Sequence, residues 1–100
     1  MKLTKRKAIE LSIELWAWLA ETGLRKYDYF EKRRGNIPFL ACFLCEYDKQ
    51  HGGNCSNCPF YKRYGHCMES YYCKWCMSDT EADRKKYATE FLAQLKELLQ

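Results

Sequence analysis

Seven cysteines between Cys42 and Cys76 constrain this chain more than any other feature. Six of them form CxxC pairs at positions 42 and 45, 55 and 58, and 73 and 76, and Cys67 stands alone between the second and third pairs. The stretch is polar and interrupted by glycines, so burial of apolar surface alone would not order it. A cross-link by disulfides or by a metal ion is therefore required.

The N-terminal residues do not form a convincing signal peptide, and this favours a metal ion over disulfides as the cross-link. A basic start precedes an apolar run, as in a signal peptide, but Glu10 and Glu14 interrupt that run, and Glu21-Thr22-Gly23 is not a small-residue cleavage site. No apolar run approaches the ~18 residues of a membrane span. We expect a cytoplasmic protein, in which structural disulfides are disfavoured and clustered CxxC pairs indicate metal. The odd number of thiols agrees, because seven cannot all pair within one chain.

The first two CxxC pairs have the spacing of a zinc site. A tetrahedral metal needs two pairs of ligands, and each CxxC turn places two thiolates on one side of a tight reversal. Nine residues separate the pairs, and Gly52-Gly53 among them supplies a turn. The sequence therefore predicts Zn²⁺ bound by Cys42, Cys45, Cys55 and Cys58.

The remaining cysteines suggest a second site. Cys67, Cys73 and Cys76 would form a Cys3His site with His66, or with His51, as the fourth ligand. One alternative is a single site in which the third CxxC pair replaces one of the first two. In another, Cys67 is a small buried hydrophobe and the two histidines are ordinary partly exposed residues.

Other cofactors and catalysis fit the pattern less well. A rubredoxin-like iron uses the same two pairs, whereas iron-sulfur clusters commonly have a tighter run of ligands. A thioredoxin-type redox dithiol would need a neighbouring βαβ unit, and the sequence predicts none. Four cysteines close the metal site and leave no open position for a hydrolytic zinc, and Asp48-Lys49-Gln50-His51 only thinly imitates the site of a His-Cys nuclease. We expect no enzymatic activity.

The two ends of the chain read as amphipathic helices. Thr4 is a plausible N-cap for a helix over residues 5–22, and Gly23 is placed to end it. The apolar arc of this helix covers more than half its circumference, so we expect contacts on more than one side. Ser78 and Glu81 have capping-box spacing and predict a second helix over residues 79–99.

The segments between the helices are less regular. Residues 24–35 mix aromatic and charged side chains and could form a short helix or an irregular link, and Asn36-Ile37-Pro38 disfavours helix. We predict one domain over residues 1–100, small, mostly α and metal-stabilised. The terminal helices pack together, and the cysteine-rich region 42–76 consists of loops and a short hairpin.

Aromatic and basic side chains are the candidates for partner binding. The formal charge of +4 invites a nucleic-acid interpretation, but a Zn(Cys)4 site carries about −2 and would lower the charge to roughly +2. Tyr, Trp and Arg often anchor protein interfaces, so we favour a protein partner. The candidate residues are Lys32, Arg33, Arg34, Tyr61, Lys62, Arg63, Tyr64, Tyr71, Tyr72 and Trp75.

Two other functions remain open. The same residues would suit stacking on single-stranded nucleic acid, although Asp28, Glu31 and Glu69 lie beside the basic ones. A structural or assembly component could instead oligomerise through the wide apolar face of the first helix.

Several short motifs together resemble a known group. The runs Trp18–Gly23, Cys42–Tyr47 and Cys55–Pro59, the later Cys67 and a closing amphipathic helix resemble small cysteine-rich proteins encoded by tailed bacteriophages. The resemblance implies metal-binding cysteines at positions 42, 45, 55 and 58, a host-cytoplasmic setting, and a host or defence protein as the partner. It implies no activity, and the third CxxC pair is additional to the simplest form of the pattern.

Overall fold

Helices make up almost all of the regular structure in the computed structural model, which describes residues 2–33 and 37–99. Within these ranges 72% helix and no strands are found, so the prediction of a mostly α protein is confirmed. The Cα radius of gyration is 12.7 Å, close to the ~13 Å expected for a compact domain of this length. None of the described helices is both long and apolar enough to cross a membrane.

Helix α1 spans Lys5–Thr22, as predicted, because both of its ends are capped. The Thr4 hydroxyl accepts a hydrogen bond from the Lys7 N–H at 3.1 Å. At the other end Gly23 adopts φ +71°, and its N–H donates to the Leu19 carbonyl at 3.0 Å. Glycine takes this left-handed conformation without the strain that a Cβ would cause.

Helix α6 spans Glu81–Glu97, a shorter range than predicted. Its N-cap is Thr80, whose hydroxyl accepts from the Asp83 N–H at 3.1 Å. The predicted capping box at Ser78 is wrong, because the Ser78 hydroxyl instead donates to the Lys74 carbonyl at 2.7 Å and so contacts the preceding helix.

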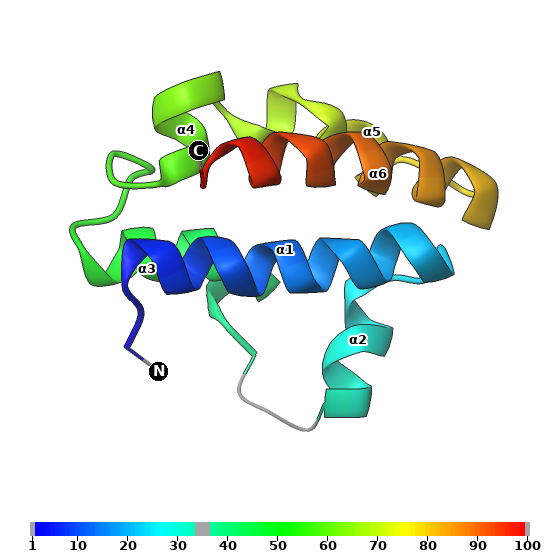
Figure 1. Ribbon diagram of the computed structural model, residues 1–100, viewed down its shortest axis with the longest axis horizontal. Coiled ribbons are helices and arrows are strands. Elements are labelled where there is room, and N and C mark those ends of the chain that lie inside the picture. Colours follow the sequence, from blue (N-terminus) through cyan, green and yellow to red (C-terminus); the bar gives the residue numbers. More distant parts are fainter. Residues whose placement is uncertain (1, 34–36, 100) are drawn as a thin grey trace.

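The terminal helices pack side by side along most of their length, as predicted (Figure 1). Their contact centres on Trp16, whose ring lies 4.6 Å from that of Phe91. Gly23 allows the close approach of α6, since a Cβ at this position would lie 2.9 Å from the Glu81 carbonyl oxygen. Other buried residues of this core are Ala8, Ile9, Leu15, Leu19, Ala88 and Leu95.

Helix α1 also packs against elements other than α6. Helix α2, Lys26–Arg33, forms within the segment that the sequence left undecided, and α3 spans Phe43–Gln50. Both pack against α1, which explains its wide apolar arc. Trp18 is partly buried on this side, with its ring 5.4 Å from that of Tyr29.

The cysteine-rich region is more helical than predicted. Besides α3 it contains α4 at Pro59–Tyr64, the 3-10 turn η2 at Cys67–Glu69 and α5 at Tyr71–Cys76. A further 3-10 turn, η1, spans Phe39–Ala41. The predicted hairpin is wrong, since residues 42–76, all of them described, contain no strand. Proline at the first position of α4 and polar caps on α3 and α5 start helices too short to show a clear apolar period.

Candidate metal centre

A cavity of about 240 Å³ gathers most of the potential metal ligands of this protein. Aromatic and aliphatic side chains of α1, α4 and α6 form its apolar lining, among them Trp16, Phe60 and Leu95. Its sulfur and imidazole donors are Cys42, Cys45, Cys55, Cys58, Cys67 and His66. The four predicted ligands of the first site therefore share one cavity.

The first CxxC pair lies at the start of α3. Cys42 is the N-cap of this helix, and its sulfur accepts a hydrogen bond from the Cys45 N–H at 3.3 Å. The Cys45 thiol also hydrogen-bonds to Cys42, which lowers the pKa of Cys42 to about 6 and raises the pKa of Cys45. The helix N-terminus thus holds one sulfur of this pair ready to become a thiolate.

Asp48 fixes the loop that carries the second CxxC pair. Its buried carboxylate accepts hydrogen bonds from the backbone N–H groups of Cys55 and Asn57, each at 2.8 Å. Its carbonyl accepts from the Gly53 N–H, also at 2.8 Å. Asp48 therefore attaches residues 53–57 to the last turn of α3. Sequence reasoning considered this residue only as part of an imitated nuclease site and missed its role.

The backbone of the loop at residues 52–55 is strained. Gly52 and Gly53 adopt φ +126° and +81°, which confirms the predicted glycine turn. Asn54 and Cys55 follow with φ +61° and +65°, in a region that residues other than glycine rarely occupy. Strain of this kind is concentrated at functional sites, where the surrounding contacts maintain it.

Cys58 and Cys67 complete the sulfur lining of the cavity. Burial, with smaller contributions from the neighbouring thiols of Cys42 and Cys67, raises the pKa of Cys58 to about 11, although backbone N–H groups of α4 oppose the rise. Burial likewise raises the pKa of Cys67, and the nearby thiols of Cys42 and Cys55 act in the same direction. These sulfurs are therefore close enough to influence one another, and a metal that bound them would displace their protons.

The residues of the predicted second site do not all lie together. His66 and Cys67 line the same cavity as the first four cysteines. Cys73 and Cys76 lie on α5 and do not line this cavity. Cys76 is also exposed. His51 is exposed, with its Nδ1 2.8 Å from the Tyr47 carbonyl oxygen.

The donors of the cavity have not converged on a single point. Among residues 2–33 and 37–99, no three His, Cys, Asp or Glu side chains are already arranged around a common metal position. Metal binding would therefore require the donor side chains to come closer together, for example by changes of rotamer. Soft thiolates and an imidazole suit zinc in their chemistry.

The predicted partner-binding residues divide into exposed and buried groups. Tyr61, Lys62 and Arg63 are exposed on α4, and Arg63 donates to the Glu97 carbonyl at 2.9 Å. Trp75, also among the predicted partner-binding residues, is instead buried, and its ring packs 4.8 Å from that of Trp16 in the core. The partly buried residues are Tyr64, which donates to the Glu97 carboxylate, and Tyr71 and Tyr72.

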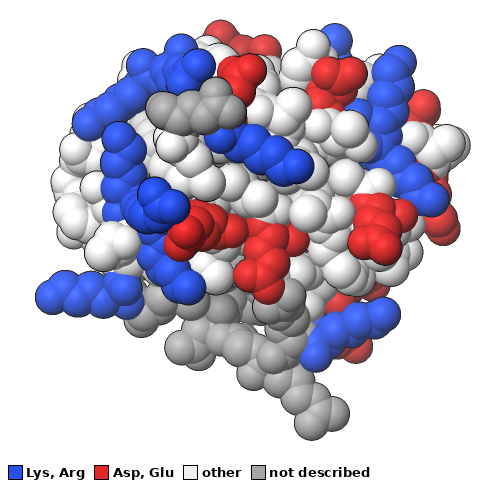
Figure 2. Space-filling view, viewed as in Figure 1, with Lys and Arg blue, Asp and Glu red and all other residues white. Residues whose placement is uncertain are grey.

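The basic run of residues 32–34, at the end of α2, is only partly described. The Lys32 ammonium lies 5.9 Å from the centre of the Trp18 ring. The side chain of Arg33 and the whole of Arg34 lie outside what the structure describes. On the face seen in Figure 2, Lys and Arg alternate with Asp and Glu and form no continuous basic surface.

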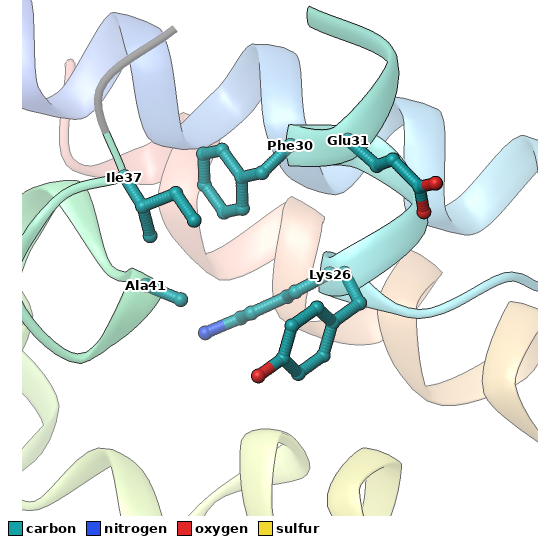
Figure 3. A pocket seen from close by; sticks show the side chains of 6 residues that line it. Lys26, Phe30, Glu31, Ile37 and Ala41 are labelled. Carbon is teal, nitrogen blue, oxygen red and sulfur yellow. The ribbon is translucent and has the colours of Figure 1, made fainter. Parts of the chain in front are cut away.

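A second, larger cavity of about 490 Å³ lies beside α2 (Figure 3). Two of its lining residues are apolar and exposed, since Tyr27 is 84% exposed and Ile37 58% exposed. Sequence reasoning missed this surface. Its lining consists of Lys26, Tyr27, Phe30, Glu31, Ile37 and Ala41.

Comparisons of this chain with protein-family models, with curated proteins and with solved structures find no match.

Proposed function

We propose that this protein is a non-enzymatic binding module whose fold is stabilised by one zinc ion. The observation that carries the proposal is the cavity shared by five thiols and one imidazole. Such a concentration of soft donors in a domain this small is typical of a structural metal centre. Bound zinc would contribute to folding directly, because the ligands are brought together only in the folded chain.

Four of the six donors would suffice for a tetrahedral site. Cys42 influences the pKa of Cys45, Cys58 and Cys67, which makes these four sulfurs one candidate ligand set. The set predicted from spacing uses Cys55 in place of Cys67. In either set four protein ligands saturate the ion, which suits a structural role.

A protein partner is the second part of the proposal. The exposed apolar side chains of Tyr27 and Ile37, which line the cavity beside α2, form the kind of surface that marks an interaction site. Exposed Tyr61 and Arg63 on α4 add residue types common in interface anchors. The resemblance to phage proteins suggests that this partner is a host or defence protein in the host cytoplasm.

Metal content tests the first part. We expect about one zinc per chain in the protein purified without added metal, measured by elemental analysis, and a lower melting temperature after chelation. Cys42→Ser should abolish stoichiometric zinc, whereas Cys76→Ser, outside the cavity, should retain it. A protein that contains no metal and unfolds at the same temperature with and without chelator would contradict the proposal, and iron in place of zinc would redirect it to electron transfer.

A pull-down with the zinc-loaded protein from host lysate tests the second part. We expect a partner that Tyr27→Ala and Ile37→Asp release and that Glu90→Gln, an exposed change on α6, does not. The contradicting result is nucleic-acid binding without a protein partner, with an affinity that falls steeply as salt increases. A concentration-dependent oligomer without any partner would favour an assembly role.

A further inference from the structure

Lys26 places a positive charge in the cavity beside α2. The residue is only 9% exposed, although lysine is rarely buried unless it is paired. Its ammonium extends into the cavity toward Ala41, and the Glu31 carboxylate points away from it (Figure 3). No acidic side chain within residues 2–33 and 37–99 forms an ion pair with Lys26. The cavity therefore contains a cation that can still pair with a carboxylate from outside the chain.

The Lys26 ammonium is already held in position by two aromatic side chains. It donates to the Tyr72 hydroxyl at 2.9 Å. It also lies 4.5 Å from the centre of the Tyr72 ring and 5.6 Å from that of Trp16, so both rings make cation–π contacts with it. The bond to Tyr72 uses one of three ammonium donors, and no other described group accepts a hydrogen bond from it. An ordered cation loses little freedom when it binds an anion, which favours binding.

The rest of the cavity lining offers apolar contacts around this single cation. Apart from the two charged residues, the lining consists of Tyr27, Phe30, Ile37 and Ala41. One cation among apolar side chains suits one carboxylate that has an apolar neighbour. A nucleic-acid backbone carries a phosphate at every nucleotide and is bound by several cations, which this cavity does not offer. Charge and lining together therefore favour an acidic segment of a protein over a nucleic acid.

We propose that the cavity beside α2 binds a segment of the protein partner in which one acidic residue stands next to an aliphatic or aromatic residue. The inference rests on the protein partner proposed above and adds the chemistry of the segment that binds. The carboxylate pairs with the Lys26 ammonium, and the apolar neighbour packs against Tyr27 and Phe30. The pair forms largely out of water, where opposite charges attract more strongly than on an open surface. The segment carries only one acidic residue here, because the Glu31 carboxylate repels a second.

Peptide selection tests the chemistry of the segment. A displayed library of short random peptides is selected on the purified protein, and peptides that also bind Tyr27→Ala are discarded. We expect the retained peptides to share an acidic residue beside an aliphatic or aromatic one. A selection that retains no peptide, or peptides without a shared acidic residue, would overturn the inference. The lysate pull-down decides separately whether any protein binds, so this failure is distinguishable from failure of the proposed function.

Paired substitutions test the contact with Lys26. In fluorescence polarisation of a labelled selected peptide, replacing its acidic residue by the corresponding amide should weaken binding at least about tenfold. Lys26→Met keeps the length of the side chain and removes its charge. It should weaken binding of the acidic peptide by a similar factor, and both changes together should cost little more than either alone. Lys32→Met removes an exposed cation of α2 outside the cavity and should leave the affinity within about threefold.

Two results of this cycle would overturn the inference. One is an affinity that the amide replacement in the peptide leaves unchanged, a result that does not depend on how well Lys26→Met folds. The other is a pair of losses that multiply when both changes are made, because the carboxylate would then bind somewhere other than Lys26. Either result would leave the protein partner itself in place.

Discussion

Asp48→Asn should destabilise the protein although it replaces a single oxygen by an amide nitrogen. The two carboxylate oxygens of Asp48 each accept one backbone N–H, from Cys55 and from Asn57. Asparagine can accept only one of these, and its NH2 group would then face the other N–H. The cost is one hydrogen bond to a charged acceptor and one buried N–H without a partner, together about 2–4 kcal/mol. This is a large part of the 5–15 kcal/mol that stabilises a typical domain.

Urea unfolding followed by circular dichroism measures this cost. Asp79→Asn is the matched control, because Asp79 is exposed and its replacement should change the free energy of unfolding by less than about 0.5 kcal/mol. Asp48→Asn should also weaken zinc binding, since part of the binding free energy would then order the loop that carries Cys55. If Asp48→Asn had the unfolding midpoint and zinc affinity of the wild type, Asp48 would not position this loop.

Three further changes test other parts of the structure. Gly23→Ala should cost more in thermal unfolding than the about 1–2 kcal/mol of left-handed strain alone, because the new Cβ would lie 2.9 Å from the Glu81 carbonyl oxygen; a loss below this range would show that α6 gives way at no cost. Trp75→Ala should destabilise by about 3–5 kcal/mol and Tyr61→Ala by less than about 1 kcal/mol in urea, and the reverse order would contradict the burial of Trp75. The metal-free protein should lose stability as pH rises from about 9 to about 11. Burial raises the pKa of Cys58, so in this interval the unfolded chain has lost the thiol proton while the folded chain still holds it, and the free energy of unfolding falls. A melting temperature that stays constant over this range would contradict the last prediction.

Local signals explain which helices could be predicted. Thr4 and Gly23 have unambiguous roles at the ends of a long periodic segment, and α1 has the predicted bounds. Before α6, Ser78 and Thr80 both have side chains that could cap the helix. Which of them becomes the N-cap depends on the other hydrogen bonds that each hydroxyl can form. Ser78 reaches a carbonyl of α5, a contact that sequence spacing cannot reveal.

The candidate metal centre was predictable only in part, for a similar reason. The CxxC spacing identifies Cys42, Cys45, Cys55 and Cys58 because each pair is local. The position of Cys67 in the same cavity depends on how α4 and η2 fold back over α1 and α6. The burial of Lys26 also arises from packing, since nothing in a run of charged and aromatic residues distinguishes it from its exposed neighbours.

The pairing of α1 with α6 has a consequence for folding during synthesis. More than half of the chain separates the two helices, so the part of the apolar arc of α1 that packs against α6 cannot be covered until α6 has left the ribosome. The cysteine cavity draws on residues that emerge earlier, between Leu40 and Met68, as well as on the two long helices. A metal held by these earlier residues would shorten the loop that α1 and α6 must close, which lowers the entropic cost by about 0.5 kcal/mol. The supply of metal would then affect how long the growing chain exposes a surface prone to aggregation.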